Sequence, residues 1–223
     1  MCSKVNWWND ERISWYESAS EYSQFHSILA GILTQSIRKE DKVIEAGSGL
    51  GYLTNALYTE GIKNIKGYDI DEKAIAFASS HFDSNLFELK DIFTENEMCD
   101  VLVCVFFGKL SRNNNFESFS RIARRKIIYV TGGGSARHVP PEEIMYYLDS
   151  VDADYTIRPM TIPFNQPFVD ETEAERFLQS YYKDDIRNDK RKCIKSCPIP
   201  GYPIMLENKK DITIFEIEMG GNK

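Results

Sequence analysis

The sequence predicts a doubly wound α/β fold, in which a mostly parallel sheet carries helices on both faces. Apolar runs alternate with stretches of helical periodicity between residues 41 and 134, and this alternation is typical of a parallel sheet. The run "DVLVCVFF" at residues 100–107 is apolar almost throughout, as expected for a central strand covered on both faces. A glycine-rich turn, "GSGLG" at residues 47–51, directly follows the first predicted strand.

The elements of the first half follow in regular order. Residues 7–38 have the three-four spacing of apolar side chains that predicts a helix. Strands are predicted at 43–46, 62–69, 85–92, 100–107 and 126–134. Helices are predicted between them at 52–60, 71–82 and 116–125. Gly61 is a plausible C-cap for the first of these helices, and Asp71 suits the positive start of the second.

The second half is less regular. A helix led by proline is predicted at 140–151, and another at 170–182, where Asp170 and Glu173 form a capping box. A strand is predicted at 155–164, a loop at 184–201, and two strands on either side of "ENKK" at 207–210. No convincing linker interrupts the chain, so residues 1–223 are expected to form one domain.

Composition and charge narrow the class of protein. The 223 residues suffice for one full core, and the formal net charge of -7 argues against a general nucleic-acid binder. Two basic clusters, at 121–126 and 187–195, are interpreted as solvated helix ends and a loop. No apolar run approaches the roughly 20 residues of a membrane span. The N-terminal residues lack the apolar core of a signal peptide, so we expect a cytoplasmic protein with no membrane part.

The five cysteines are an odd number without regular spacing, which predicts no disulfide framework. Cys193 and Cys197 raise the question of an iron–sulfur site. Pro200 stands where the next cysteine ligand would be required. We therefore expect free thiols and no metal.

Three classes of ligand use a glycine turn at the exit of a strand. A nucleoside triphosphate needs a lysine and a hydroxyl residue after the last glycine, but Tyr52 and Leu53 follow here. A dinucleotide fingerprint has one more residue between its second and third glycines, and the carboxylate of Glu45 would repel a pyrophosphate. A cationic ligand would be attracted to that carboxylate, and S-adenosylmethionine carries both an ammonium and a sulfonium.

The stretch "VIEAGSGLGYL" resembles the first motif of the class I S-adenosylmethionine-dependent methyltransferases, an acid followed by Gly-x-Gly-x-Gly. The resemblance implies a seven-stranded sheet whose last strand is antiparallel, which suits the two strands around residues 207–210. It assigns S-adenosylmethionine as the cofactor. The cofactor-binding residues that it implies in this motif are Glu45, Gly47, Ser48, Gly49 and Gly51.

The same resemblance implies further contacts with the cofactor. Asp69 would accept hydrogen bonds from both ribose hydroxyls. Asp91 would face the adenine amino group, with Ile70 and Ile92 beside the ring. Phe106, at the end of the fourth strand, would lie near the methylthio group. Residues 1–40 would form a helical lid that includes Tyr22, residues 41–134 the cofactor-binding core, and residues 135–223 a half with an acceptor-site insertion.

The acceptor is predicted from weaker signals. Methyltransferases that act on the adenine amine or on glutamine usually have Asn or Asp, two prolines and an aromatic residue after the fourth strand, and "CVFFGKL" departs from that pattern. We therefore predict a small-molecule acceptor, with Phe107, His26 and His138 as candidate substrate-binding residues. Methyl transfer from an activated donor can be driven by alignment and exclusion of water, so no catalytic residue is assigned.

Three alternatives stay open at this point. The chain could methylate RNA or a protein, using the basic stretch at 187–195. It could bind S-adenosylmethionine without turnover, or it could be an NAD-dependent oxidoreductase. The sequence makes no prediction about the oligomeric state.

Overall fold

The computed structural model describes residues 7–94, 96–132 and 139–220. These residues form two compact units, and each is considered separately below. Of the described residues, the larger unit contains Trp7, 26–161 and 211–220, and the smaller contains 8–25 and 162–210. The smaller unit therefore joins an N-terminal helix to a long insertion near the end of the chain. The expected single domain and its divisions at residues 40 and 134 stay a prediction.

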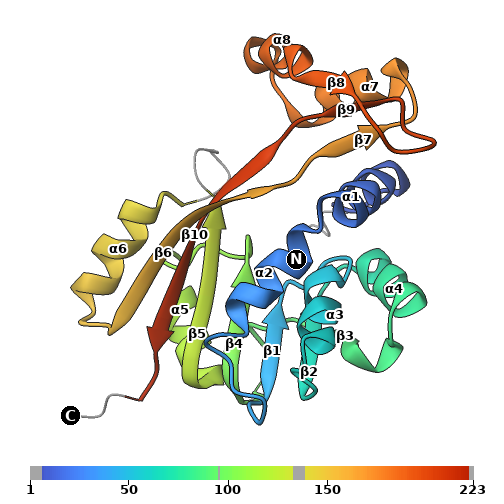
Figure 1. The fold of residues 1–223 in the computed structure, drawn as a ribbon. Helices are drawn as coiled ribbons and strands as arrows, with labels where there is room; N and C mark the ends of the chain where they lie inside the picture. The colour runs from blue at the N-terminus through green and yellow to red at the C-terminus, as the bar shows by residue number, and fades with distance from the viewer. Residues whose placement is uncertain (1–6, 95, 133–138, 221–223) are drawn as a thin grey trace. The chain divides into compact units, whose positions relative to one another are not determined.

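The larger unit is built on a seven-stranded sheet with the order β3-β2-β1-β4-β5-β10-β6 (Figure 1). The strands are β1 (Val43–Ala46), β2 (Ile65–Asp69), β3 (Phe87–Leu89), β4 (Cys99–Val105), β5 (Ala123–Gly132), β6 (Tyr155–Pro163) and β10 (Lys209–Glu218). Strand β1 pairs in parallel with β2 and β4, β4 with β5, and β2 with β3, whereas β10 pairs antiparallel with β5. The predicted sheet with an antiparallel last strand is confirmed.

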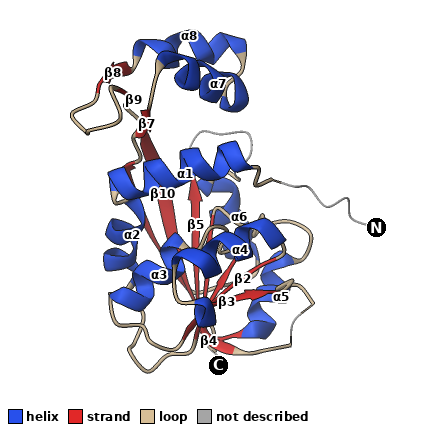
Figure 2. Cartoon of the chain, turned by 90° about the vertical axis from the view of Figure 1, so that its right-hand side faces the viewer, coloured by secondary structure: helices blue, strands red, loops and turns tan. Residues whose placement is uncertain are grey.

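Helices cover both faces of this sheet, as predicted for a doubly wound fold. They are α2 (Phe25–Leu33), α3 (Tyr52–Thr59), α4 (Glu72–His81), α5 (Asn115–Ile122) and α6 (Pro141–Ser150). Helices α2 and α3 lie on one face, and α5 and α6 on the other (Figure 2). Strands β1 and β4 are thereby enclosed, and all four residues of β1 are buried. Their continuous apolar runs are explained by this cover on both sides.

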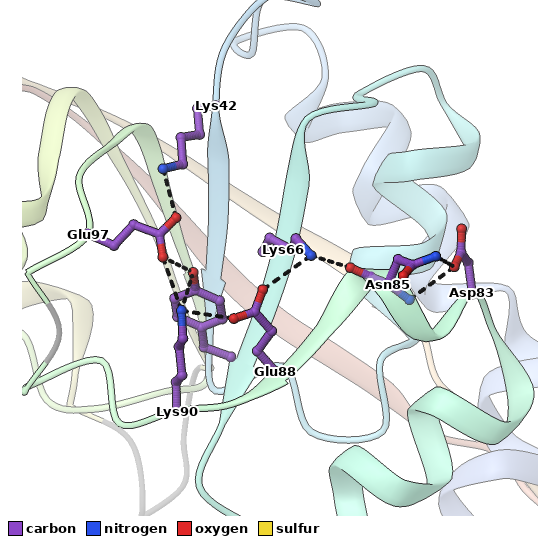
Figure 3. A network of polar contacts seen from close by, with 8 residues as sticks. Lys42, Lys66, Asp83, Asn85, Glu88, Lys90 and Glu97 are labelled. Carbon is purple, nitrogen blue, oxygen red and sulfur yellow. Dashed lines mark hydrogen bonds and ion pairs between the residues drawn. The ribbon is translucent and has the colours of Figure 1, made fainter.

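An ion network covers β2 and β3 where no helix follows β3 in the described part of the chain (Figure 3). Lys90 binds Glu88 at 2.8 Å and Glu97 at 3.1 Å, and Lys42 binds Glu97 at 2.8 Å. Hydrogen bonds from Lys42 and from the Tyr68 hydroxyl, which donates at 2.5 Å, hold the pKa of Glu97 down to about 2. The network fixes the outer end of Tyr68, a residue whose backbone supports the glycine loop described below.

The smaller unit has its own antiparallel sheet in the order β7-β9-β8. Its elements are α1 (Asp10–Ser23), β7 (Gln166–Phe168), α7 (Glu171–Tyr181), α8 (Asp184–Lys192), β8 (Ile194–Ser196) and β9 (Ile204–Leu206). Trp15 of α1 is buried and contacts the ring of Phe177 edge-to-face, with 5.3 Å between centroids. Phe168 packs on Phe177 in the same way at 5.3 Å. A small aromatic core thus holds the N-terminal helix to the insertion.

Two predicted elements differ from the structure. The helix predicted over residues 7–38 is divided at Gln24, whose φ of 52° places it in the left-handed region and ends α1. The loop predicted at 184–201 contains α8 and β8. In α8, acids occupy the first turn and bases the last turn, which stabilises a helix without any buried side chain.

The two strands predicted on either side of "ENKK" are present, but they belong to different sheets and do not form a hairpin with each other. Strand β9 pairs with β7 and β8 in the small sheet, whereas β10 pairs with β5 in the large one. Both segments have the alternating pattern of a strand, but pairing partners are chosen by contacts that lie far away in the sequence.

The structure places two of the cysteines around strand β8 and pairs part of the first basic cluster with acids. Cys193 and Cys197 flank β8, so about 13 Å of extended chain separates them at ~3.3 Å per residue. Among the described residues, no group of three or more His, Cys, Asp or Glu is arranged to hold a metal. In the first basic cluster, Arg125 pairs with Asp41, and Lys126 pairs with Glu216 at 2.8 Å.

No helix in the described part of the chain combines the length and the apolar character that crossing a bilayer requires.

Candidate functional site

The glycine loop leaves β1 and turns sharply into α3. The N–H groups of Gly47 and Ser48 donate to the carbonyl of Tyr68 at 2.8 and 3.0 Å, which ties the loop to the end of β2. Gly47, Gly49 and Gly51 have φ values of 71°, 52° and 82°. Side chains are disfavoured at all three positions, because the left-handed region strains residues with a Cβ. The predicted turn at a strand exit is therefore present.

Gly47 is also required by a close contact. A Cβ on Gly47 would lie 2.2 Å from Cδ2 of Phe107, so the Phe107 ring packs directly on the loop backbone. Phe107 also stacks on Phe93, with 5.9 Å between ring centroids. Phe107 was assigned to the substrate, but in the structure it forms a wall of the glycine loop.

Asp69 sits at the end of β2 and holds the loop from the other side. Its Oδ2 accepts a hydrogen bond from Gly49 N at 2.8 Å, and its Oδ1 accepts one from Asp71 N at 2.9 Å. Burial raises the pKa of Asp69, and the two backbone donors oppose that rise. Each carboxylate oxygen accepts one backbone bond and keeps acceptor capacity for a further donor.

Glu45 is buried beneath the loop, with a side chain that is 4% exposed. It accepts a hydrogen bond from the Thr54 hydroxyl of α3. Burial, together with the nearby charge of Asp69, raises the pKa of Glu45 to about 8. The carboxyl is therefore mainly protonated at neutral pH, which differs from the ionised acid that we expected at this position.

Ser48 directs its side chain into the protein. Its hydroxyl is buried without a hydrogen-bond partner in the described part of the chain. A Cβ on Gly67 of β2 would lie 2.8 Å from Cβ of Ser48 and 2.6 Å from Oγ1 of Thr54. Gly67 is thus the residue that lets α3 and the loop approach β2, and a glycine inside a short strand is the sequence signal that indicates such an approach.

The apolar residues near the loop differ in exposure. Ile70 is 69% exposed and Phe93 is 44% exposed, so both present apolar surface at the carboxyl ends of β2 and β3. Ile92 is only 3% exposed and belongs to the core, and its assignment to the cofactor stays a prediction. Asp91 is exposed, and its Oδ1 accepts a hydrogen bond from Phe93 N at 3.0 Å.

Phe106 has a φ of 54°, which is rare for an aromatic residue. Its N–H donates to the carbonyl of Val130 at 2.9 Å, so this conformation is fixed by the neighbouring strand β5. Strained backbone of this kind costs about 1–3 kcal/mol and occurs often at functional sites.

The remaining predicted residues lie in different surroundings. His26 is 7% exposed and its ring stacks on Tyr52, the first residue of α3, at 5.4 Å. Tyr22 belongs to the smaller unit, and its assignment to the cofactor stays a prediction. His138 lies outside the described residues.

Sequence reasoning missed Thr54 and the ion network around Lys90. Thr54 lies three residues after Gly51, where its hydroxyl can reach back to the acid before the loop, but a threonine in a helix is too common to stand out. The network joins residues in or next to four strands, β1, β2, β3 and β4, and only the sheet order reveals that these strands are neighbours.

Comparisons with solved structures agree with this architecture. The YcgJ protein from Bacillus subtilis aligns with a TM-score of 0.56 and 16% identity, over 88% of this chain and 99% of that one. Magnesium protoporphyrin IX methyltransferase from Synechocystis PCC 6803 aligns with a TM-score of 0.55 and 14% identity, over 93% and 86%. The larger unit has the class I methyltransferase fold. At these identities the likeness concerns the class I methyltransferase fold alone.

Sequence comparisons cover part of the chain. Residues 28–107 match the family described as ribosomal protein L11 methyltransferase (PrmA). The ribosomal protein L11 methyltransferase of Staphylococcus carnosus is 34% identical over 59 residues, and that of Staphylococcus saprophyticus is 39% identical over 49 residues. These matches cover 26% and 22% of this chain, and only 19% and 16% of the relatives' own lengths. The family match runs from α2 to just beyond β4, the part of the larger unit that contains the glycine loop.

Proposed function

We propose that this chain binds S-adenosylmethionine at the glycine loop and transfers its methyl group to a small-molecule acceptor. The observation that carries the proposal is the arrangement of Asp69 and Gly49, in which an acid at the end of β2 accepts a hydrogen bond from the middle glycine of a glycine-rich loop. In this arrangement a ligand could approach the backbone of the glycine loop, and the carboxylate of Asp69 lies beside that backbone.

The residues of the larger unit fit an adenosyl cofactor. Asp69 has acceptor capacity for two vicinal hydroxyls, as the ribose requires. Ile70 and Phe93 offer exposed apolar surface for the adenine ring. Asp91, with Oδ2 free of the Phe93 bond, can accept from the adenine amino group. Glu45 is buried under the loop, where its carboxylate would attract the ammonium or the sulfonium of the cofactor.

The cofactor supplies an activated methyl group on a sulfonium. The chain's own residues then need to align the acceptor and exclude water. Phe107 and Phe93, stacked on each other beside Gly47, are the apolar side chains that can exclude water at the loop.

A small-molecule acceptor is supported by charge and by sequence. An RNA acceptor would need the basic side chains of residues 187–195, but most of them form ion pairs. The pairs are Arg187 with Asp184, Arg191 with Glu175, Lys192 with Asp189 and Lys195 with Glu207. Because these cations are balanced locally, the segment lacks the unneutralised charge that phosphate binding requires. Strand β4 is also followed by Phe106 and Phe107. The Asn or Asp with two prolines and an aromatic residue, which is typical of methyltransferases that act on the adenine amine or on glutamine, is absent at this place.

A protein acceptor is the second candidate. It is favoured by the matches to ribosomal protein L11 methyltransferases, whose names state a protein substrate. The family match concerns the segment that holds the glycine loop, whereas the insertion at 162–210 lies outside residues 28–107. The acceptor of those relatives is therefore weak evidence for the acceptor of this chain.

Cofactor binding is tested with Asp69→Asn. Titration calorimetry with S-adenosylhomocysteine, the demethylated product, should give at least about tenfold weaker binding in this variant, because a charge-assisted acceptor becomes neutral. Asn retains one oxygen for the loop, so the fold should persist. Asp83→Asn is the matched control, since Asp83 caps a short 3-10 helix away from the loop and should bind as the wild type does. Equal affinity of all three proteins would contradict the site.

The acceptor class is tested with a radiolabelled methyl donor and a cell extract separated by size. Label in the low-molecular-weight fraction is expected. Label in protein would establish the second candidate, and label removed by ribonuclease would contradict both. Cofactor binding without any labelled product would indicate a binding protein that does not turn over.

A further inference from the structure

The smaller unit has a surface hollow whose walls come from three separate segments. It has a volume of about 250 Å³ and is lined by Ser18, Glu21, Tyr22, Pro167, Ile199 and Tyr202. One water molecule occupies about 30 Å³ in the liquid, and drug-sized ligands use pockets of about 300–1,000 Å³. The hollow therefore suits a group the size of a side chain.

One wall is a β-turn that its own sequence specifies. The N–H of Tyr202 donates to the carbonyl of Ile199 at 3.1 Å, which closes a four-residue turn. Pro200 and Gly201 occupy its centre, and Gly201 has a φ of 88°. Proline followed by a left-handed glycine is the pattern of a type II turn. Both side chains that this turn presents, Ile199 and Tyr202, line the hollow.

The opposite walls are held together by a buried amide. Nε2 of Gln166 donates to Oγ of Ser18 at 3.0 Å and to the carbonyl of Pro167 at 3.1 Å. The Ser18 hydroxyl donates in turn to the carbonyl of Trp15 at 3.1 Å. These bonds tie α1 to β7, so the two walls keep their spacing without a ligand.

The hollow is negatively charged. Burial and the carboxylates of Glu21, Glu173 and Glu17 together raise the pKa of the Tyr202 hydroxyl. Glu21 lines the hollow, and no other described residue makes a hydrogen bond or an ion pair with its carboxylate. None of the six lining residues is a Lys, an Arg or a His. A carboxylate beside two phenol rings attracts a cation both directly and through the ring faces.

We propose that this hollow binds an alkylammonium group. The Glu21 carboxylate accepts the N–H donors of the ammonium, while the rings of Tyr22 and Tyr202 and the apolar surfaces of Pro167 and Ile199 cover the alkyl stem. The group could come from a free amine or from a lysine side chain. The proposal concerns the smaller unit alone and does not depend on methyl transfer.

The test is an NMR titration of the full chain, with tyrosine rings isotopically labelled and no methyl donor present. Cadaverine and N-acetyl-lysine amide are the two amine probes, and n-pentanol is the uncharged probe of similar length. We expect the ring signals of Tyr22 and Tyr202 to shift with an amine and to stay unchanged with n-pentanol. A response to cadaverine indicates a free amine as the source, and a response to N-acetyl-lysine amide alone indicates a lysine side chain.

Glu21→Gln removes the charge at an exposed position, so the fold should be unaffected. This variant should bind the amine at least about tenfold more weakly. Glu171→Gln, which removes an exposed carboxylate elsewhere in the smaller unit, is the matched control and should bind as the wild type does. No shift with either amine, an equal shift with n-pentanol, or equal weakening in both variants would overturn the proposal. None of these outcomes bears on cofactor binding in the larger unit.

Discussion

Glu45 shows how much the surroundings of a single side chain change its chemistry. An acid before a glycine loop suggests a fixed negative charge, but this carboxyl is buried, bonded to Thr54 and close to a second acid. A cation bound above the loop would favour its ionised form and release a proton. The ligand that we propose carries two such cations.

The free protein should show the effect of Glu45 in its stability. The folded pKa of about 8 lies above the reference value of 4.5, so the neutral carboxyl stabilises the fold below 4.5, and that contribution is lost as the pH rises through 8. Urea unfolding between these pH values should show a decline of at most about 1.4 kcal/mol per pH unit from this group. Glu45→Gln, which keeps an acceptor for Thr54, should lack that decline.

The control for this measurement is Glu60→Gln, which changes an exposed carboxylate at the end of α3 and should keep the wild-type slope. Identical slopes in the Glu45 and Glu60 variants would mean that Glu45 is ionised in the free protein.

At the scale of elements, local sequence signals decide helix ends well. Asp71 accepts from the N–H groups of Lys73 and Ala74 at the start of α4, and Asp170 accepts from Glu173 at the start of α7. The Glu173 side chain reaches back to Val169 N at 2.7 Å, one residue before the N-cap. The capping box predicted from the sequence thus forms with this small shift.

Removing the N-cap of α7 should destabilise the smaller unit. Asp170→Ala leaves the Glu173 N–H without its 2.7 Å acceptor, so we expect a loss of about 1 kcal/mol in the free energy of unfolding. Chemical denaturation measures this loss. It is followed by the fluorescence of Trp15 in a background with Trp7→Phe and Trp8→Phe, which leaves Trp15 as the tryptophan that emits. Glu171→Ala, a neighbouring exposed acid that leaves the cap intact, should cost only a few tenths of a kcal/mol. A loss of equal size in both variants would contradict the role of Asp170 as a cap.

At the scale of the whole molecule, each of the two units buries apolar side chains of its own in the described part of the chain. Trp15, Phe168, Phe177, Leu178 and Leu206 are buried in the smaller unit, and the larger core surrounds the seven-stranded sheet. All three tryptophans lie in the first fifteen residues, and Trp15 is the buried one of the three. Its emission therefore reports on the core of the smaller unit.

A variant that keeps only Trp15, with Trp7→Phe and Trp8→Phe, separates the two unfolding transitions. S-adenosylhomocysteine at about a hundred times its dissociation constant should stabilise the unit that binds it by about 2.7 kcal/mol. We expect the transition seen by far-ultraviolet circular dichroism to move to higher denaturant, and the Trp15 fluorescence transition to stay in place. A fluorescence transition that moves by itself would place the ligand in the smaller unit.

Much of the larger unit could be predicted because its signals are local. The first strand was predicted at Val43–Ala46 and is observed there, since an apolar run followed by glycines can hardly form anything else. The acid at the end of β2, Asp69, was implied by the resemblance to the methyltransferase family, and it is found at that strand end. The pairing of β9 with β7 could not be predicted in this way, because α7, α8 and β8 lie between them in the chain and their packing leaves no local trace.

The sequence by itself determined the order of strands and helices from residue 43 to residue 132 and the glycine turn after the first strand, because each depends on backbone preferences and apolar patterns within a few residues. Only the tertiary structure decided that Glu45 is buried and neutral, that Phe107 packs on Gly47, and that residues 8–25 join residues 162–210 in a second unit. These features arise from desolvation and packing between segments far apart in the chain, and such contacts exist only after the chain has folded.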